Sequence, residues 1–190
     1  MKEVETLIKK ALKYKESGLT ELEIADELNV SKETAAWFLS KGKEKKPTGD
    51  LKIGWRSIGI YPTRISSISD ALCDIINEEC GEEVDTIVGI AINGIPYATF
   101  IADYLGLELA VFRPHYEKSG AFSSNYASVK GKNVVFVDDV VGTGETFKSA
   151  IKAAKAEKAK TALCIALINK RARNKIDDVP LRALIRARVL

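Results

Sequence analysis

The chain has 190 residues, of which 46% are hydrophobic, and a net charge of +3. This length suits one main domain of about 140 residues with a small appendage, and it allows a sizeable buried core. No apolar run reaches the roughly 18 residues of a membrane span, and the amino-terminal residues lack the apolar core of a signal peptide. We therefore expect a cytoplasmic protein with no membrane partner. The net charge is too small to indicate a nucleic-acid partner by itself.

The first 40 residues are predicted to form three short helices. Residues 1–16 place apolar side chains at helical spacing, and Thr20 with Glu23 forms a capping box for a second helix. A turn at residues 29–31 then separates the second helix from a third, which Ser31 would cap. The face of the third helix that is expected to point outward carries Lys32, Glu33, Thr34, Trp37 and Lys41.

This segment resembles the helix-turn-helix of bacterial and archaeal regulators, with Asn29 where a turn glycine is usual. Asparagine tolerates the left-handed backbone that glycine supplies, so the change is mild. The resemblance implies that DNA is a partner. The alternative is a helical bundle that packs on the main domain or mediates dimer contact. Lysines up to residue 46 and then Pro47 indicate a linker, so we predict domains at 1–46 and 47–190.

Helices and apolar strands alternate through the rest of the chain. Helices are expected over residues 65–80, 96–105 and 146–158, and strands over 84–92, 108–113, 134–137 and 161–168. This order predicts an α/β fold with a mostly parallel sheet, and places sites at the carboxyl ends of its strands. The basic tail from Lys170 is expected as a short strand or helix; it is a solvated face or a contact for DNA phosphates or for a base.

The most informative stretch is VVFVDDVVGTGET, from Val134 to Thr146. Its apolar run is expected to be a buried strand that stops at Asp138 and Asp139, followed by a glycine turn at the start of a helix. Backbone amides at such a turn suit a phosphate, whereas the carboxylates suit sugar hydroxyls. The residues therefore predict a phosphorylated sugar as ligand. The alternative is an ordinary strand-to-helix turn.

Two commoner phosphate motifs are excluded. A Walker loop needs Lys and then Ser or Thr after its last glycine, but Glu145 and Thr146 follow Gly144. A dinucleotide fingerprint needs a small residue where Phe147 stands.

The stretch resembles the phosphoribosyl-pyrophosphate (PRPP) signature of type I phosphoribosyltransferases, especially the orotate type. The resemblance implies that Asp138 and Asp139 hold the ribose hydroxyls and serve catalysis in an enzyme. It implies that the following loop cradles the 5-phosphate, with Glu145 in place of the family's usual small residue. That loop comprises Val140, Val141, Gly142, Thr143, Gly144, Glu145 and Thr146.

Two further segments resemble parts of this family. Ile92, Asn93 and Gly94 correspond to its pyrophosphate loop, for which a plain strand-to-helix turn is the alternative. Arg113 matches the arginine that leads a flexible catalytic loop, expected here over residues 114–132. Lys118 lies one position away from a family lysine in that loop, and the family's other lysine positions are not kept. This loop therefore keeps fewer of the lysines with which the enzymes close over PRPP.

The whole architecture resembles archaeal orotate phosphoribosyltransferase-like transcriptional regulators, a group associated with control of sugar catabolism. It implies a homodimeric regulator that binds DNA and senses PRPP or a nucleotide, with Mg²⁺ carried by PRPP and no direct protein ligand to the metal. One alternative is an active purine or pyrimidine phosphoribosyltransferase, and another makes the amino-terminal helices a protein-interaction module.

Overall fold

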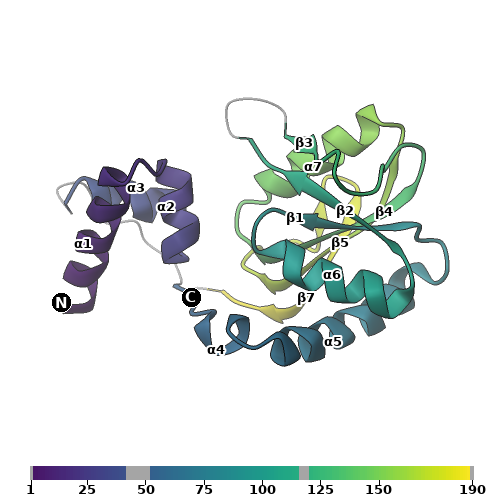
Figure 1. Cartoon of the computed structure of the whole chain (residues 1–190), viewed down its shortest axis with the longest axis horizontal. Coiled ribbons are helices and arrows are strands. Elements are labelled where there is room, and N and C mark those ends of the chain that lie inside the picture. Colours follow the sequence, from purple (N-terminus) through teal and green to yellow (C-terminus); the bar gives the residue numbers. More distant parts are fainter. Residues whose placement is uncertain (1, 42–51, 116–119, 189–190) are drawn as a thin grey trace. The chain divides into compact units, whose positions relative to one another are not determined.

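The structure, a computed structural model, describes residues 2–41, 52–115 and 120–188. The chain divides into two compact units between Ser57 and Ile58. Figure 1 labels the helices and strands of both units. The domain boundary predicted between residues 46 and 47 lies outside the described residues, as do the linker lysines.

The amino-terminal unit is built from α1 (Lys2–Glu16), α2 (Glu21–Leu28) and α3 (Lys32–Leu39). Their apolar sides form one core, because the predicted helical spacing gathers them on one face of each helix. The predicted capping box is present: the Thr20 N–H donates to Glu23 Oε2 at 2.8 Å, and the Glu23 N–H donates to Thr20 Oγ1 at 3.3 Å. The buried members of the core are Leu7, Ala11, Ile24, Ala25, Leu28, Ala35 and Phe38.

The turn between α2 and α3 has the conformation that the sequence predicts. Asn29 is left-handed, with φ 52° and ψ 52°, and its N–H donates to the carbonyls of Ala25 and Asp26. Ser31 caps α3, because its Oγ accepts the Thr34 N–H at 3.1 Å. The three helices fit a helix-turn-helix.

Replacing Asn29 tests how strongly this turn depends on the left-handed backbone. A β-branched residue is disfavoured there, so Asn29→Val is expected to destabilise the amino-terminal unit by about 1–2 kcal/mol. Asn29→Gly is the matched control and should stay within about 0.5 kcal/mol, because glycine adopts this conformation freely. Urea denaturation followed by the fluorescence of Trp37, with Trp55→Phe in every variant, measures both. Equal losses for the two variants would contradict the prediction.

The second unit contains a seven-stranded sheet in the order β3-β2-β1-β4-β5-β7-β6. The five inner strands are β2 (Glu108–Arg113), β1 (Thr86–Ile90), β4 (Asn133–Val141), β5 (Lys160–Asn169) and β7 (Val179–Arg186), and they run parallel. The edge strands β3 (Ala121–Phe122) and β6 (Lys175–Ile176) are antiparallel. The predicted α/β class with a mostly parallel sheet is confirmed.

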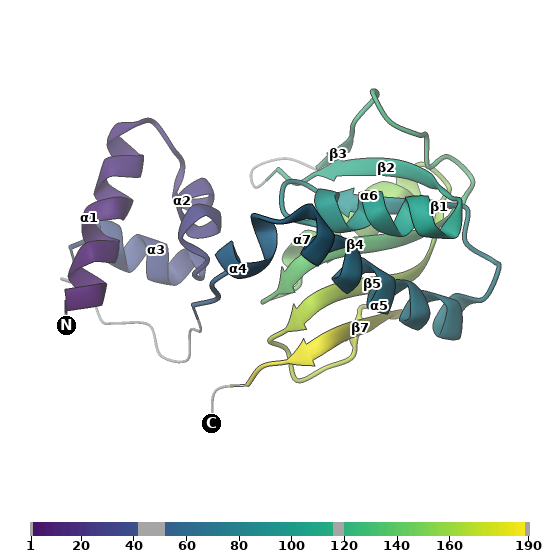
Figure 2. The same cartoon turned by 60° about the horizontal axis from the view of Figure 1, so that its bottom comes forward.

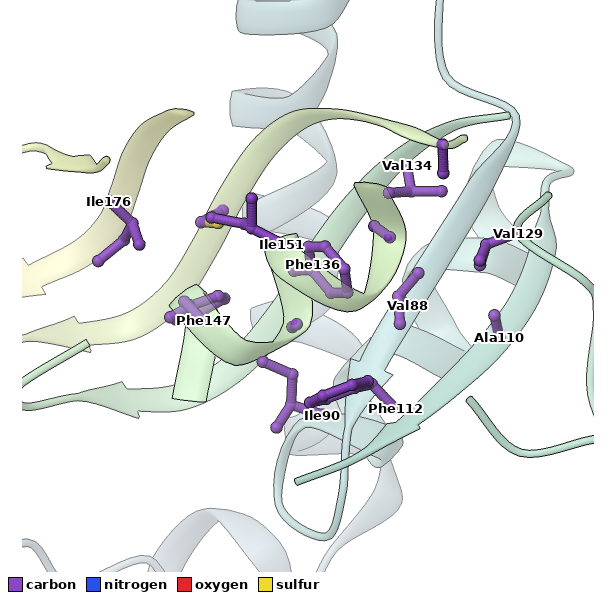
Figure 3. Packing of buried hydrophobic residues seen from close by; sticks show 14 of the residues in the cluster. Val88, Ile90, Ala110, Phe112, Val129, Val134, Phe136, Phe147, Ile151 and Ile176 are labelled. Atoms are coloured by element: carbon purple, nitrogen blue, oxygen red, sulfur yellow. The ribbon is translucent and has the colours of Figure 1, made fainter. Parts of the chain in front are cut away.

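Helices cover both faces of this sheet. Val88 and Ile90 lie in the core beneath α7 (Glu145–Ala156), together with Phe136, Phe147 and Ile151, as Figure 3 shows. Gly89 between them faces α6 (Gly94–Leu105), which comes so close that a Cβ on Gly89 would lie 2.9 Å from Ile95 Cα. Helix α5 (Pro62–Cys80) packs beside α6. The short α4 (Arg56–Gly59) precedes α5.

Several predicted boundaries need correction. Helix α5 starts at Pro62 rather than at residue 65, because a proline suits the first helical turn. Helix α6 starts at Gly94 rather than near Pro96. The largest difference concerns β4, which continues through the acid pair to Val141 instead of stopping before it.

The predicted long loop after β2 is partly ordered against the sheet. Residues Ala121 and Phe122 pair with Arg113 and Phe112 as β3. The Ala127 N–H then donates to the Leu109 carbonyl at 3.0 Å, and Val129 is buried. The second half of the segment is therefore an extension of the sheet edge, while residues 116–119 lie outside the described part. No helix among the described residues is long and apolar enough to cross a membrane.

Candidate functional site

The acid pair lies within the last residues of β4, the central strand of the sheet. Asp138 is half-buried and Asp139 is 8% exposed. One carboxylate oxygen of each accepts the next backbone N–H: Asp138 Oδ1 from Asp139 at 2.9 Å, and Asp139 Oδ1 from Val140 at 2.7 Å. Both side chains are thus held by the backbone of the strand.

Burial sets the protonation behaviour of Asp139. Desolvation raises the pKa of this carboxyl above its usual value, and hydrogen bonds from Asp138, Val140 and Asn93 oppose that rise. Its neighbour Tyr97 is also buried; desolvation, followed by the repulsion of Asp139, raises the pKa of the phenol to about 12. The contact with Asn93 brings the two predicted ligand loops together at one edge of the sheet.

Gly94 explains how the loop after β1 comes so close to β4. A Cβ at this position would lie 2.2 Å from the Val137 carbonyl oxygen and 3.1 Å from Asp138 Cα. The role of Gly94 is therefore to allow close approach between two main chains. Asn93 precedes α6 as its cap residue, and Ile92 is 79% exposed beside it. The predicted pyrophosphate loop thus lies directly against the acid pair.

The glycine turn after β4 has the shape that was predicted for a phosphate cradle. Gly144 has φ 85°, a left-handed conformation, and caps α7, whose 12 residues give an ordinary helix dipole. Gly142 and Thr143 are exposed. The Glu145 N–H lies 3.4 Å from Thr143 Oγ1, while the Glu145 side chain turns along the helix and pairs with Lys148 at 2.7 Å. Its carboxylate therefore points away from the amides of the turn, which lessens its conflict with a phosphate.

Arg171 belongs to no motif in the sequence, yet it contacts the phosphate turn. Its guanidinium donates a hydrogen bond to the Thr143 carbonyl. The same side chain fills the space beside Gly144, where a Cβ would lie 2.5 Å from Arg171 Nη1. The Arg171 N–H donates to the buried Asn169 Oδ1 at 2.8 Å, which fixes the start of the loop after β5. In the sequence, Arg171 stands out only as part of the basic tail. A contact that is made by tertiary structure leaves no local sequence pattern.

The residues predicted to close the site are only partly described. Arg113 is exposed at the end of β2, where it pairs with Ala121 of β3. Lys118 lies outside the described residues. The structure therefore places Arg113 at the carboxyl edge of the sheet with the other candidates.

The predicted DNA-contacting face of α3 is only partly exposed. Lys32 and Glu33 are exposed on α3, in agreement with the prediction, whereas Lys41 is exposed but lies two residues past the end of the helix. Trp37 instead packs against the core of the three helices, with its ring centroid 5.5 Å from that of Phe38. Thr34 is half-buried, and its hydroxyl accepts a hydrogen bond from Ser31 Oγ at 3.1 Å. Trp37 and Thr34 are therefore less exposed than the sequence predicted.

The raised pKa of Asp139 gives a stability prediction with a definite sign. The folded state holds this proton more tightly than the unfolded chain does, so the contribution of Asp139 to stability falls as pH rises from about 3.8 through its raised pKa. Asp139→Asn removes the cost of burying a charged carboxylate, so it is expected to raise the free energy of unfolding at pH 7. The difference from the unsubstituted protein should shrink as the pH is lowered through that window. Urea denaturation at several pH values measures this difference. A variant that is less stable than the unsubstituted protein at pH 7 would contradict a raised pKa for Asp139.

Comparisons with known proteins agree with this geometry. Residues 54–184 match the family model described as phosphoribosyl transferase domain. The proteins named transcriptional regulator GfcR of Thermoplasma acidophilum and Picrophilus torridus are 48% and 44% identical, and the alignments cover 100% and 98% of this chain and 98% of each relative.

The fold is similar to that of adenine phosphoribosyltransferase from Thermoanaerobacter pseudethanolicus, with a TM-score of 0.62, 20% identity, and coverage of 75% of this chain and 90% of that chain. At this identity the likeness concerns the fold alone. The chain therefore belongs to the phosphoribosyl transferase domain family and, over its whole length, to the transcriptional regulators that these two archaeal relatives represent.

Proposed function

We propose that this regulator binds promoter DNA through its amino-terminal unit and binds PRPP or a nucleotide as an effector at the carboxyl edge of its sheet. Its regulatory target would be sugar or nucleotide metabolism, and it would act in the cytoplasm as a homodimer, since a helix-turn-helix generally reads paired half-sites. The observation that carries the proposal is the Asn93–Asp139 contact, which joins the acid pair to the loop after β1 beside an exposed phosphate turn.

The three parts of this edge match the three parts of PRPP. The turn from Gly142 to Thr146 offers backbone amides at a helix start, which suit the 5-phosphate. The carboxylates of Asp138 and Asp139 suit the ribose hydroxyls, because a carboxylate accepts hydrogen bonds and repels phosphate. The loop at Asn93 and Gly94 then lies where the diphosphate of a bound PRPP would leave the ribose.

Magnesium would be held largely by the ligand. Within the described residues, no group of three or more histidine, cysteine or acidic side chains converges on one point. The acid pair supplies carboxylate oxygens, which Mg²⁺ prefers, but one oxygen of each is engaged with a backbone amide. Mg²⁺ commonly binds through one or two carboxylates plus phosphates and waters. This donor set fits an ion that arrives with PRPP and neutralises part of its diphosphate charge.

The decisive experiment is fluorescence anisotropy at fixed physiological salt. The full chain is titrated against the DNA upstream of its own gene and against a scrambled duplex, each with and without Mg·PRPP. We expect tighter binding to the native sequence and a shift of that affinity with Mg·PRPP. Equal, weak binding to both duplexes that Mg·PRPP does not change would overturn the proposal.

Substitution on α3 then tests which residues read the sequence. Lys32 is exposed in the first turn of this helix. Lys32→Ala is expected to reduce the preference for the native duplex by about 1–3 kcal/mol if its side chain reaches a base edge. Lys9→Ala, an exposed lysine on α1, is the matched control and should leave the preference unchanged. The ratio of the two dissociation constants measures the effect, and an unchanged ratio for Lys32→Ala would place the reading elsewhere.

The second candidate function is an active phosphoribosyltransferase, which the acid pair and phosphate turn favour. A base nitrogen would form a bond to C1 of the ribose as the C1–O bond to pyrophosphate breaks, and pyrophosphate would leave with the bonding electrons. Asp138 and Asp139 would hold the sugar while positive charge develops on its ring. An assay for pyrophosphate release with a panel of purines and pyrimidines tests this reading, and no release with any base would contradict it.

A further inference from the structure

Positive charge is concentrated near the carboxyl end of the chain. Seven of the 29 lysines and arginines lie between residues 170 and 188, but only two of the 26 acidic residues do. The remainder of the chain consequently has a net charge of −2. Among these seven cations, Arg182 is neutralised by a two-point contact with Glu79, at 2.6 and 2.8 Å. Arg173, Arg186 and Arg188 have no acidic residue within three positions of them in the sequence.

Three exposed arginines of this segment lie at the end of β7 and on the loop that is hydrogen-bonded to it. They are Arg173, Arg186 and Arg188, which we call the basic rim. The loop that carries Arg173 is fixed to β7: the Leu181 N–H donates to the Asn174 carbonyl at 2.9 Å, and an Arg188 Nη donates to the Ala172 carbonyl at 3.5 Å. The ends of β5 and β7 lie side by side, because Asn169 pairs with Arg186, and Figure 2 shows both strands ending at the same edge.

Acidic side chains lie far from the outer end of the basic rim. The nearest acids in the sequence, Asp177 and Asp178, form the turn before β7, and Arg186 is seven residue steps along the strand from Val179. At a strand rise of about 3.3 Å per residue this is about 23 Å, well beyond a screening length of about 8 Å in physiological salt. Asp138 and Asp139 belong to β4, and the whole of β5 separates that strand from β7. Arg186 and Arg188 are thus not neutralised by these acids.

The exposure of the basic rim favours an extended polyanion over a small phosphate ligand. Its arginines are exposed, whereas the candidate phosphate turn is a separate feature built from β4 and α7. Arg171 is the cation that contacts that turn, through Thr143, and it is half-buried. Arginine guanidinium groups on an open surface suit successive phosphates of a nucleic-acid backbone, which they contact independently of base sequence.

We infer that the basic rim is a second DNA-contacting surface, which binds backbone phosphates and adds sequence-independent affinity to that of the helix-turn-helix. This inference rests on the proposed function, since it requires that the chain binds DNA. It assigns the specificity to the amino-terminal unit and part of the affinity to the phosphoribosyltransferase-like unit. Each phosphate contact of the rim should appear as about 0.9 in the slope of log K against log salt concentration.

The test compares the full chain with Arg186→Gln/Arg188→Gln by anisotropy over a range of salt concentrations. The variant is expected to bind native and scrambled duplexes more weakly by the same factor, with the slope reduced by about 2 per bound chain. Lys152→Gln/Lys155→Gln is the matched control, because it removes the same charge from exposed positions of α7. That control should keep the slope of the unsubstituted protein. Calorimetry should give unchanged Mg·PRPP affinity for the Arg186→Gln/Arg188→Gln variant.

Three results would overturn the inference. An unchanged slope in the arginine variant, with DNA binding intact, would show that the rim contacts no phosphate. A loss of Mg·PRPP affinity without a change in slope would assign these arginines to the effector site. Failure of the unsubstituted chain to bind DNA would overturn the proposed function itself, and this inference with it; the titration of the unsubstituted protein separates that case from the other two.

Discussion

Replacing Asp138 and Asp139 together by asparagine is expected to abolish measurable binding of Mg·PRPP. Each carboxylate would accept a hydrogen bond from a ribose hydroxyl, and a hydrogen bond to a charged acceptor contributes about 1.5–3 kcal/mol. The loss of both amounts to about 3–6 kcal/mol, or roughly two to four decades of affinity. Isothermal titration calorimetry of the full chain measures the change.

The direction of this effect distinguishes two roles of the acid pair. Removal of two negative charges should by itself favour an anionic ligand, so carboxylates that only repelled the phosphates would give tighter binding in the variant. Glu145→Gln is the matched control, because this carboxylate lies on the same loop but pairs with Lys148. Its affinity should stay close to that of the unsubstituted protein. Unchanged or tighter binding by the asparagine variant would refute the assignment of the pair to the sugar.

Gly94→Ala is expected to have the second largest effect, because it should lower both stability and ligand affinity. The new Cβ would lie 2.2 Å from the Val137 carbonyl oxygen, a main-chain atom of the central strand that cannot turn aside as a side chain can. Either β4 or the loop at Asn93 must move, and such overpacking costs about 1–3 kcal/mol or more. Because the same shift separates Asn93 from Asp139, we expect at least a tenfold loss of Mg·PRPP affinity as well.

Gly142→Ala provides the control for the stability measurement. A Cβ at Gly142 would meet no atom within 4 Å, and its φ lies outside the left-handed region. Urea denaturation followed by circular dichroism should therefore leave this variant within about 0.5 kcal/mol of the unsubstituted protein. Similar stability losses for the two glycine variants would show that the close approach to Val137 is not what demands glycine at residue 94.

The order of helices and strands could be predicted because apolar spacing repeats faithfully along this chain. The apolar run within Glu108–Arg113 predicts a strand, and Asn29 is one of the few residue types that tolerate a left-handed turn. The continuation of β4 through Asp138 and Asp139 could not be predicted, because acidic residues are rare inside buried strands. Their burial is sustained by backbone amides and by Asn93, and such partners become visible only when the loops are in place. Likewise, the two-residue strand β3 is too short to leave a pattern.

The candidate site was located from its motifs, but its internal contacts were not. Asp139, Asn93 and Gly94 were each identified from local sequence, and the structure adds that they touch. Arg171 was missed because nothing near it in the sequence resembles a site, and its link to Thr143 joins segments 28 residues apart. The orientation of Trp37 was wrong because α3 has only eight residues, too few to define a single apolar stripe. Tertiary packing decided which side of that helix was covered.

The separate core of the amino-terminal helices affects how the chain unfolds. Its buried residues run from Leu7 to Phe38, and the cluster beneath α7 runs from Val88 to Leu181, so the two cores share no residue. Where the two cores unfold separately, unfolding of the whole chain is not an all-or-none event. The two units then have separate free energies of unfolding, and a single melting temperature would not describe the protein. Selection could adjust the stability of the DNA-reading unit while leaving that of the effector-binding unit unchanged.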